Sequence, residues 1–409
     1  MKKIILFALA FLATFPLAAQ QLTVSVENPS KEIRTDVPVV IALDRYDTGE
    51  DFHPIVKAHI VNGNRPELIQ EIPCQLSGKE LVFLADVKAK STATYSVDLQ
   101  GGEPSYDNAE RVHAQLKLWD RKYRYPRINE IEFQGDVDPR AMYDAIYGHG
   151  AMWESEYVGF RVYMDNRQSI DLYGKKHPQM ELDTVNFYSN RDFLAAGYGE
   201  DILWAGQSIG AGSFRGLTDG QPVYIDKVKA RGQRVVDAGP LRTIVEVWDR
   251  DWEINGRKLQ MLQRYTMFGG HRDVMVDIFL RGEKADISEV DKLVFATGSQ
   301  KLEQDNEGLM QKDGLVGSWG RNVPDKNAPD LIEGLGIGVY AEPQYVEKVL
   351  EDDLNYLVHL HPVGGHIRYH LSVAADMQLE GGYHDAKAWF GHLKEWQQVL
   401  QTPCKITIR

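Results

Sequence analysis

The 409-residue sequence is acidic, with 46 Lys and Arg against 59 Asp and Glu and a formal net charge of −13 at pH 7. This charge disfavours nucleic acid and anionic membrane surfaces, so we expect neither as a partner of the mature protein. At roughly 100–200 residues per domain, the length allows two hydrophobic cores.

Residues 1–19 have the three parts of a secretory signal peptide. Two lysines precede the apolar run 4–13, and a small-residue exit, Leu17-Ala18-Ala19, precedes Gln20-Gln21. A retained membrane anchor is the alternative, but Pro16 and the polar pair leave the apolar run short for a bilayer. We therefore expect a periplasmic or secreted protein whose net charge falls from −13 to −15 when the two lysines are removed.

Short alternating runs dominate residues 22–100, for example 22–26 and 93–97, and Pro and Gly separate them. Such runs are typical of a small β-sandwich. The polar, turn-rich segment 101–108 then predicts a boundary. The expected organisation is a signal peptide (1–19), an N-terminal β-sandwich (20–104) and a larger domain (105–409).

The larger domain continues the β pattern with successive strands predicted over 242–249, 258–267 and 273–280. The pair Asn255-Gly256 between the first two is a strong hairpin signal. One helix is predicted over 385–401, after an Asp385 cap, and a last strand over 405–408 would close the sheet. The sequence thus predicts an all-β protein with few helices.

The two cysteines, Cys74 and Cys404, are far apart in sequence. In an oxidising compartment they form one disulfide, or both stay as buried thiols. Their spacing excludes a cysteine-based zinc motif.

Parts of the sequence resemble two known groups of proteins. The run 239–243, the Asn255-Gly256 hairpin and the run 277–280 resemble the galactose-mutarotase-like β-supersandwich shared by aldose mutarotases and several polysaccharide lyases. The segments 28–30, 171–175 and 206–212 resemble the exported bacterial domain-of-unknown-function family numbered 4861 over nearly the whole mature chain. The resemblance implies a large antiparallel β-supersandwich and carbohydrate chemistry, commonly beside enzymes that process unsaturated uronic acids.

Residues 147–176 are unusually rich in His, Tyr, Arg and Lys for a pair of strands. The alternation over 157–163 sends Val158, Phe160 and Val162 to one face, and Arg161 and Tyr163 to the other. One face is therefore expected to be core and the other a binding or catalytic surface.

β-Elimination from a uronic acid needs a base for the C5 proton, a neutraliser of the carboxylate and an acid for the leaving oxygen at C4. His and Tyr suit proton transfer, and Arg or Lys suits the carboxylate. We therefore nominate as catalytic residues His149, Tyr157, Tyr173 and His361. As substrate-binding residues we nominate Arg161, Lys175, Tyr198, Trp204, Arg264, His271, His359 and Arg368.

Each nomination has a structural alternative. His149 between two glycines fits a turn, Arg161 fits a surface ion pair, and tyrosines fit sandwich-edge packing. The spacing of His359 and His361 permits a shared metal, but no third ligand is evident. No metal ligands are nominated; the sequence requires no cofactor, and Ca²⁺ is left open as a carboxylate neutraliser in place of arginine.

The glycine-rich segment 197–213 lacks the Lys-Ser/Thr of a phosphate loop, which disfavours a nucleotide site. Its glycines instead allow close approach of backbone to a sugar ring beside Tyr198 or Trp204. The predicted function is a lyase or dehydratase acting on uronate-containing oligosaccharides. The alternatives are a non-catalytic glycan-binding protein and a mutarotase-like isomerase.

Overall fold

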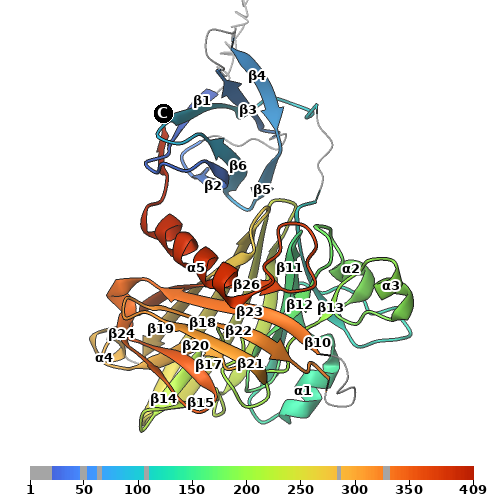
Figure 1. Ribbon diagram of the computed structural model, residues 1–409, viewed down its shortest axis with the longest axis vertical. Coiled ribbons are helices and arrows are strands. Elements are labelled where there is room, and N and C mark those ends of the chain that lie inside the picture. The colour runs from blue at the N-terminus through green and yellow to red at the C-terminus, as the bar shows by residue number, and fades with distance from the viewer. Residues whose placement is uncertain (1–20, 47–52, 62–66, 106–109, 283–286, 326–331) are drawn as a thin grey trace, which may run out of the picture.

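The computed structural model describes residues 21–46, 53–61, 67–105, 110–282, 287–325 and 332–409. The expected signal peptide lies outside these residues. Among the described residues, strands predominate and helices are few and mostly short, so the protein is all-β. Figure 1 shows a small sandwich standing on one end of a much larger one, with the helix α5 between them.

The small sandwich is built from two antiparallel sheets that enclose their own core, which includes Val24, Phe83, Tyr95 and Val97. One sheet has the order β27-β1-β7-β3-β4 and the other β2-β6-β5. The strands are β1 (Gln21–Glu27), β2 (Arg34–Ala42), β3 (Ile55–Ile60), β4 (Leu68–Ile72), β5 (Cys74–Ser77), β6 (Glu80–Val87), β7 (Thr92–Asp98) and β27 (Lys405–Ile408).

The last strand corrects one expectation about the chain's course. The strand β27 pairs antiparallel with β1, from Val24 opposite Ile408 to Glu27 opposite Lys405, and so it completes the N-terminal sandwich. It does not close the larger sheet. The helix α5 (Ala386–Gln401) returns the chain from one domain to the other, as Figure 1 shows.

The large sandwich has one layer formed by a nine-stranded antiparallel sheet of order β21-β22-β23-β26-β19-β18-β17-β16-β9. Its strands are β9 (Glu130–Gln134), β16 (Ala230–Ala238), β17 (Arg242–Ile254), β18 (Arg257–Phe268), β19 (Asp273–Gly282), β21 (Gln304–Met310), β22 (Leu315–Asn322), β23 (Glu333–Ala341) and β26 (His366–Ala375). The predicted meander is confirmed in β17 to β19. Asn255 and Gly256 both have positive φ, +47° and +73°, as a tight hairpin turn requires.

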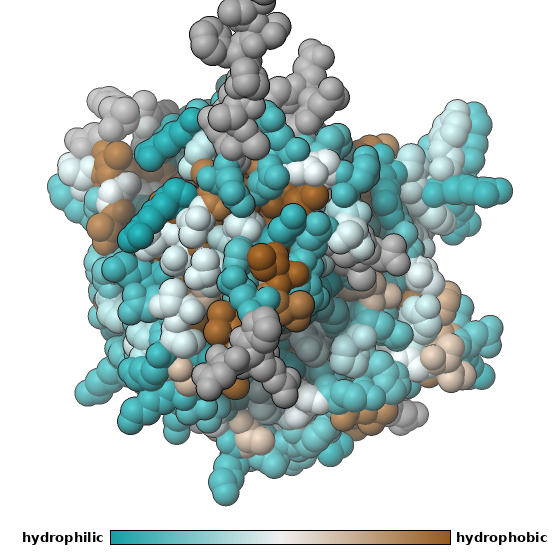
Figure 2. Space-filling model, turned by 90° about the horizontal axis from the view of Figure 1, so that it is seen from above, coloured by the Kyte–Doolittle hydropathy of each residue, from teal (hydrophilic) through white to brown (hydrophobic). Residues whose placement is uncertain are grey.

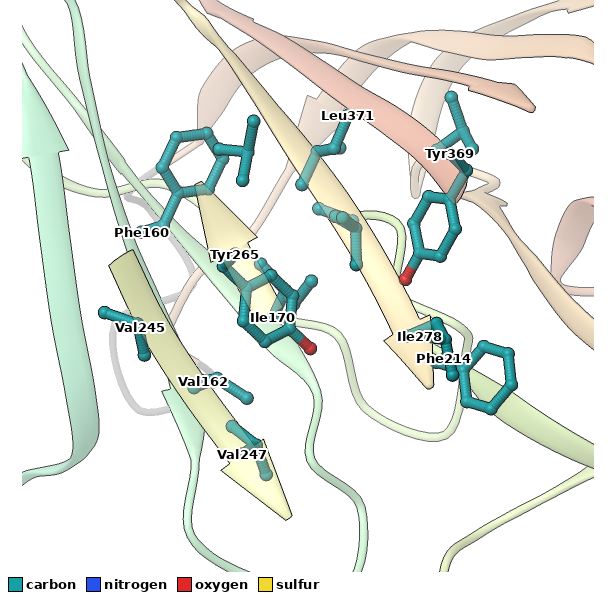
Figure 3. Packing of buried hydrophobic residues seen from close by; sticks show 14 of the residues in the cluster. Phe160, Val162, Ile170, Phe214, Val245, Val247, Tyr265, Ile278, Tyr369 and Leu371 are labelled. Carbon is teal, nitrogen blue, oxygen red and sulfur yellow. The ribbon is translucent and has the colours of Figure 1, made fainter. Parts of the chain in front are cut away.

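The facing layer consists of two five-stranded sheets, β13-β12-β11-β10-β8 and β15-β14-β20-β25-β24. Their strands are β8 (Val112–Leu118), β10 (Ile146–Ser155), β11 (Val158–Tyr163), β12 (Ile170–Gly174), β13 (Glu200–Asp201), β14 (Arg215–Thr218), β15 (Gln221–Val223), β20 (Phe295–Gln300), β24 (Val346–Glu351) and β25 (Asn355–Leu360). All three sheets contribute to one core. Figure 3 shows Phe160 and Val162 from one layer packed near Val245, Tyr265 and Leu371 of the other.

The remaining elements are short except for α5. They are α1 (Pro139–Ala145), α2 (Leu182–Val185), α3 (Arg191–Ala195), α4 (Ile287–Val290) and the 3₁₀ turn η1 (Pro343–Tyr345). The helix α5 confirms its predicted cap, since the Asp385 carboxylate accepts from the Ala388 amide at 2.7 Å. Its buried face, with Trp389, Leu393 and Trp396, packs on β22 and β23.

Polar contacts join the two sandwiches. Gln75 accepts from the amides of Leu241 and Arg242 at 2.7 and 2.8 Å, and Arg111 bonds both Asp36 and Glu156. Seen from above, the molecule is mostly hydrophilic with small scattered apolar patches (Figure 2). No disulfide joins Cys74 and Cys404 in the structure.

Candidate functional site

One outer face of the large sandwich gathers aromatic, acidic and basic side chains beside β10, β11 and β12. The residues come from α1, these strands, the segment after α2, and β13. We call this group the Tyr–His–Arg cluster. Its members are Tyr143, His149, Arg161, Tyr163, Asp171, Tyr188 and Asp201.

The position of the cluster follows from strand alternation. Val158, Phe160 and Val162 of β11 lie in the core, as predicted, so Arg161 and Tyr163 point to the opposite side. Asp171 of β12 lies directly opposite Arg161 in the register. The sheet pairing itself therefore brings the arginine and the carboxylate together.

His149 has the geometry of a neutral general base. Its Nδ1 lies 3.0 Å from the carbonyl oxygen of Tyr143, and a carbonyl only accepts, so Nδ1 carries the proton. The Nε2 lone pair is then available on a partly exposed ring. Burial lowers the pKa of His149 below its usual value, which keeps the imidazole neutral at pH 7.

Aromatic rings fix the orientation of the His149 imidazole. The Tyr143 ring stacks on it at a centroid distance of 3.7 Å and an angle of 10°. The Tyr188 ring stands edge-on at 6.1 Å. The imidazole is thus held between two tyrosines, which reduces the rotational freedom it would lose on binding a substrate.

Arg161 organises the hydroxyl groups of the cluster. The residue is only 3% exposed, and it donates to Asp171 at 2.6 and 2.9 Å and to Asp201 at 2.9 Å. The Nη2 of Arg161 also lies 2.9 Å from the Tyr163 hydroxyl, and Nη1 donates to the Tyr188 hydroxyl at 2.8 Å. Burial and the neighbouring Asp171 raise the pKa of Asp201, which favours its protonated form.

Tyr188 and two rim arginines border the opening of the cluster. Tyr188 is 44% exposed, and burial of its hydroxyl raises its pKa to about 12, so the hydroxyl is protonated at neutral pH. The guanidiniums of Arg140 and Arg167 lie 5.2 and 5.8 Å from the Tyr143 ring centre. Both are ion-paired, to Asp144 and Asp165, and both are exposed enough to meet a ligand.

Four non-glycine residues in or beside the segments that form the cluster have left-handed backbone. His149, Gln168, Asn186 and Phe187 have φ of +66°, +42°, +48° and +72°. Each such conformation costs a non-glycine residue about 1–3 kcal/mol and is most common at functional sites. His149 lies at an irregularity of β10, and Asn186 and Phe187 lie directly before Tyr188.

Tyr173 and Lys175 lie close in sequence to the cluster but are fully buried. The Tyr173 hydroxyl bonds Glu181 at 2.8 Å and the Gly199 carbonyl at 2.7 Å. The Lys175 ammonium bonds Glu154 and the carbonyls of Ser155 and Gln179, which uses its three donors. Lys175 therefore has no donor left for a uronate carboxylate, although the sequence analysis predicted that role for it.

Three further nominated residues lie near the cluster's sheet or its edge without joining the cluster. Tyr157 is in the turn between β10 and β11, where the Arg272 guanidinium lies 5.3 Å from its ring centre. Tyr198 packs on Phe193 at 5.2 Å. Trp204 follows β13 and is 46% exposed, so its ring remains accessible to a sugar.

Four nominated residues lie in other sheets. His359 is on β25, only 2% exposed, and burial lowers its pKa to about 4. His361 directly follows the same strand and is partly exposed. Arg264 and Arg368 are on β18 and β26 of the nine-stranded sheet. The structure therefore does not bring these four together with His149.

His271 lies between the two sandwiches. Its Nδ1 is 3.1 Å from Asp273, and its Nε2 is 2.9 Å from the Asp36 carbonyl. These acceptors raise the pKa of His271 to about 9, against the opposing effect of burial. The protonated ring therefore stabilises the domain contact.

This raised pKa predicts a pH-dependent stability. The contribution is complete below the unfolded pKa of about 6.5 and is lost as pH rises through 9, and it amounts to at most about 3 kcal/mol. Urea unfolding at pH 6 and pH 9.5 measures it. His271→Gln should remove most of the difference between the two pH values. An equal pH dependence in this variant would contradict the assignment.

Several cluster members were not nominated from the sequence. Tyr143, Tyr188 and Asp201 lie 18 to 40 residues from Arg161 in the sequence, and short helices and a loop bring two of them back to it. Tyr163 was placed on the correct face but was given no role. Among the described residues no group of three or more His, Cys, Asp or Glu side chains is arranged to hold a metal ion.

No helix in the described part of the chain is long and apolar enough to cross a membrane. A search of curated proteins found no match. Two solved structures from Enterococcus faecalis are similar at 10% identity and a TM-score of 0.45: a protein in glycosyl hydrolase family 38 and an alpha-mannosidase from strain V583. The match covers 95% of this chain but 47% and 46% of theirs, so this chain spans about half their length. A likeness this low supports no inference about activity.

The sequence matches the family described as Domain of unknown function (DUF4861) over residues 26–406. This match includes both sandwiches and every member of the Tyr–His–Arg cluster. The chain therefore belongs to the DUF4861 family.

Proposed function

We propose that this protein is an exported carbohydrate-active enzyme, a lyase or dehydratase, that acts by β-elimination on uronate-containing oligosaccharides at the Tyr–His–Arg cluster. One observation carries the proposal: the hydrogen bond from His149 Nδ1 to the Tyr143 carbonyl leaves Nε2 as a neutral base beside protonated tyrosines. An elimination requires one group that accepts a proton and another that donates one, and the pKa values of the two groups must differ.

The proposed reaction assigns each proton and electron pair. His149 Nε2 takes the C5 proton, the C5–H electrons form the C4=C5 bond, and the C4–O bond breaks. The leaving oxygen takes its proton from the Tyr188 hydroxyl. Water is the product if the oxygen belongs to a hydroxyl, and a shortened glycan is the product if it belongs to a glycosidic bond.

The arginines of the cluster have two different tasks in this proposal. Arg161 donates to the Tyr188 hydroxyl at 2.8 Å, so it stabilises the phenolate that forms when Tyr188 gives up its proton. The exposed guanidiniums of Arg140 and Arg167 neutralise the uronate carboxylate, which makes the C5 proton more acidic. Asp171 fixes Arg161 in place.

The test is a panel of uronate oligosaccharides incubated with the protein. Elimination creates an unsaturated uronate conjugated to its carboxylate, and ultraviolet absorbance rises. Dehydration lowers the product mass by one water, whereas a lyase splits the chain. A change of anomer ratio at constant mass would favour a mutarotase-like isomerase. Binding without any new product would favour a glycan-binding protein.

Tyr188→Phe tests the acid directly. The variant keeps the ring that borders His149 but removes the proton donor, so the elimination rate should fall by about 10²-fold or more. Tyr123→Phe, an exposed tyrosine elsewhere, is the control and should keep its rate. A substrate with a better leaving group should recover part of the loss, because it needs less help from an acid. An unchanged rate in Tyr188→Phe would remove Tyr188 from the mechanism.

A further inference from the structure

The nine-stranded sheet carries a second organised surface on its outer face. Val245, Tyr265, Ile278 and Tyr369 of its central strands point into the core, so the residues between them point outward. The Tyr–His–Arg cluster lies on the outer face of the other layer. The two surfaces are therefore on opposite sides of the large sandwich.

A row of alternating charges crosses five adjacent strands of this face. In register, Arg234 pairs with Glu246, Glu246 with Arg264, Arg264 with Asp277, and Asp277 with Arg368. The strand order is β16-β17-β18-β19-β26. Directly opposed residues share a face of the sheet, so all five side chains point to the same side.

The carboxylates of this row are buried and the guanidiniums are exposed. Glu246 and Asp277 have side chains 0% and 4% exposed, whereas Arg234, Arg264 and Arg368 are 44%, 40% and 37% exposed. Solvent therefore meets three guanidiniums that contact buried carboxylates, and Arg234 also lies 3.8 Å from the exposed carboxylate of Glu130. The Arg264 guanidinium contacts Glu246 through Nε and Nη2, and the Arg368 guanidinium contacts Asp277 through Nε.

An apolar row lies beside the arginine row. Trp248 pairs with Leu262, Leu262 with Phe279, and Phe279 with His366. All four are partly exposed. The Arg234 and Arg264 guanidiniums lie 5.9 and 5.7 Å from the rings of Trp248 and Phe279, which holds both rows rigid.

The spacing of the arginines selects the kind of ligand. Successive arginines are two strands apart, which is about 10 Å at 4.7–4.9 Å per strand. This is close to the length of one disaccharide unit in an extended glycan. The aromatic side chains can stack on the faces of the sugars in a glycan. The regularly spaced guanidiniums can bind carboxylates that recur on every second sugar.

The charge of the protein separates this ligand from denser polyanions. The whole chain has a net charge of −13, which repels any polyanion. Duplex DNA carries one charge per about 1.7 Å of axis, so that repulsion is severe. A glycan with one carboxylate per disaccharide has far fewer negative charges than DNA beyond those that the three arginines pair.

A cavity adjoins the arginine row on the same face. It has a volume of about 500 Å³ and lies between the nine-stranded sheet, β2 and the segment after α5. Arg368, Thr266 and His370 line it from the sheet, and Arg34 lines it from the small sandwich. A chain lying across the arginine row toward β26 would therefore reach this cavity.

We propose that this face is a second glycan-binding surface, which takes a linear acidic polysaccharide with a carboxylate on every second sugar. The surface holds the polymer independently of the Tyr–His–Arg cluster. The proposal needs no elimination activity, because it concerns binding on a different layer of the sandwich.

The experiment measures binding of defined hyaluronan oligosaccharides, in which glucuronate alternates with an uncharged sugar, to the whole protein by calorimetry. A His149→Ala background prevents any turnover. Arg368→Gln is the preferred variant, because Asp277 keeps its bond to His366 Nε2 at 2.7 Å and is not left unpaired. Phe279→Ala tests the apolar row.

Arg368→Gln should weaken hyaluronan binding by about tenfold or more, as expected for loss of a charged hydrogen bond. Phe279→Ala should also weaken it, because it removes a ring on which a sugar face would stack. Arg257→Gln is the matched control: it is on the same strand β18, 39% exposed and ion-paired to Glu289. It should bind within about twofold of the parent. Circular dichroism confirms that each variant is folded.

Four results would overturn the proposal. The first is equal binding by Arg368→Gln and Arg257→Gln. The second is neutral dextran or duplex DNA binding as tightly as hyaluronan, and the third is no hyaluronan binding at low salt. The fourth is loss of hyaluronan binding in His149→Ala while the unmodified protein still binds it, which would place the ligand at the cluster. Failure to detect elimination products leaves this proposal intact.

Discussion

Replacement of His149 by alanine is expected to lower the rate of elimination by about 10²- to 10⁴-fold, the range for removal of a general base. The reason is that Nδ1 of His149 donates its proton to the Tyr143 carbonyl, so the unprotonated Nε2 can accept the proton of the substrate. Because His149 has φ +66°, alanine adds backbone strain, so His149→Asn is the second variant. Asparagine tolerates left-handed backbone and cannot act as the base.

The matched control for His149 is His177→Ala. His177 is 43% exposed and contacts Glu380 at 3.0 Å, away from the cluster. It should keep the wild-type rate. If both His149 variants fold and retain activity, His149 is not the base and the proposed mechanism fails.

The pH profile gives an independent check on the same residue. Burial lowers the pKa of His149, so the neutral, basic form persists below pH 6.5 and is lost only at more acidic pH. The acidic limb of kcat/KM should therefore lie below 6.5. A limb above 6.5 that disappears in His149→Asn would contradict the lowered pKa.

Replacement of Lys175 by methionine is expected to destabilise the protein by about 3–5 kcal/mol, because it leaves the Glu154 carboxylate buried without its cation. Both side chains are at most 1% exposed. Chemical unfolding followed by fluorescence measures the change. Lys79→Met, which breaks the exposed pair with Asp44, should cost no more than about 1 kcal/mol.

The same substitution should also reduce activity at temperatures where the variant is folded. Glu154 accepts from the amides of Glu181 and Leu182 at the start of α2, at 2.8 to 3.0 Å. The left-handed residues Asn186 and Phe187 follow α2 and present Tyr188 to His149. A double variant, Lys175→Met with Glu154→Gln, should recover much of the stability. Wild-type stability in Lys175→Met alone would show that the pair contributes little.

Local patterns explain why much of the fold was predictable. The alternation over 157–163 correctly assigned Val158 and Phe160 to the core, and Asn255-Gly256 correctly marked the turn between β17 and β18. The spacing of Trp389 and Leu393 behind Asp385 predicted α5. Each of these signals depends only on residues that are close together in the sequence, within a few turns of a helix or a few residues of a strand.

Longer-range features were not predictable in the same way. The run Lys405–Ile408 reads as a strand, but nothing in it says whether its partner is in the large sheet or at β1. Lys175 and Arg161 are both basic residues in or directly after neighbouring strands. Only the packed structure shows that Lys175 uses its three donors internally, whereas Arg161 holds the hydroxyls of a partly open site.

The sequence by itself determined the all-β class, the family membership and the stretch in which His149 and Arg161 lie, because strand alternation and composition are local properties. The tertiary structure decided which of the nominated residues meet. It brought Tyr143, Tyr188 and Asp201 to His149 and Arg161, and it placed Arg264 and Arg368 on the opposite layer. The physical reason is that sheet order and register, which no single strand encodes, set these distances.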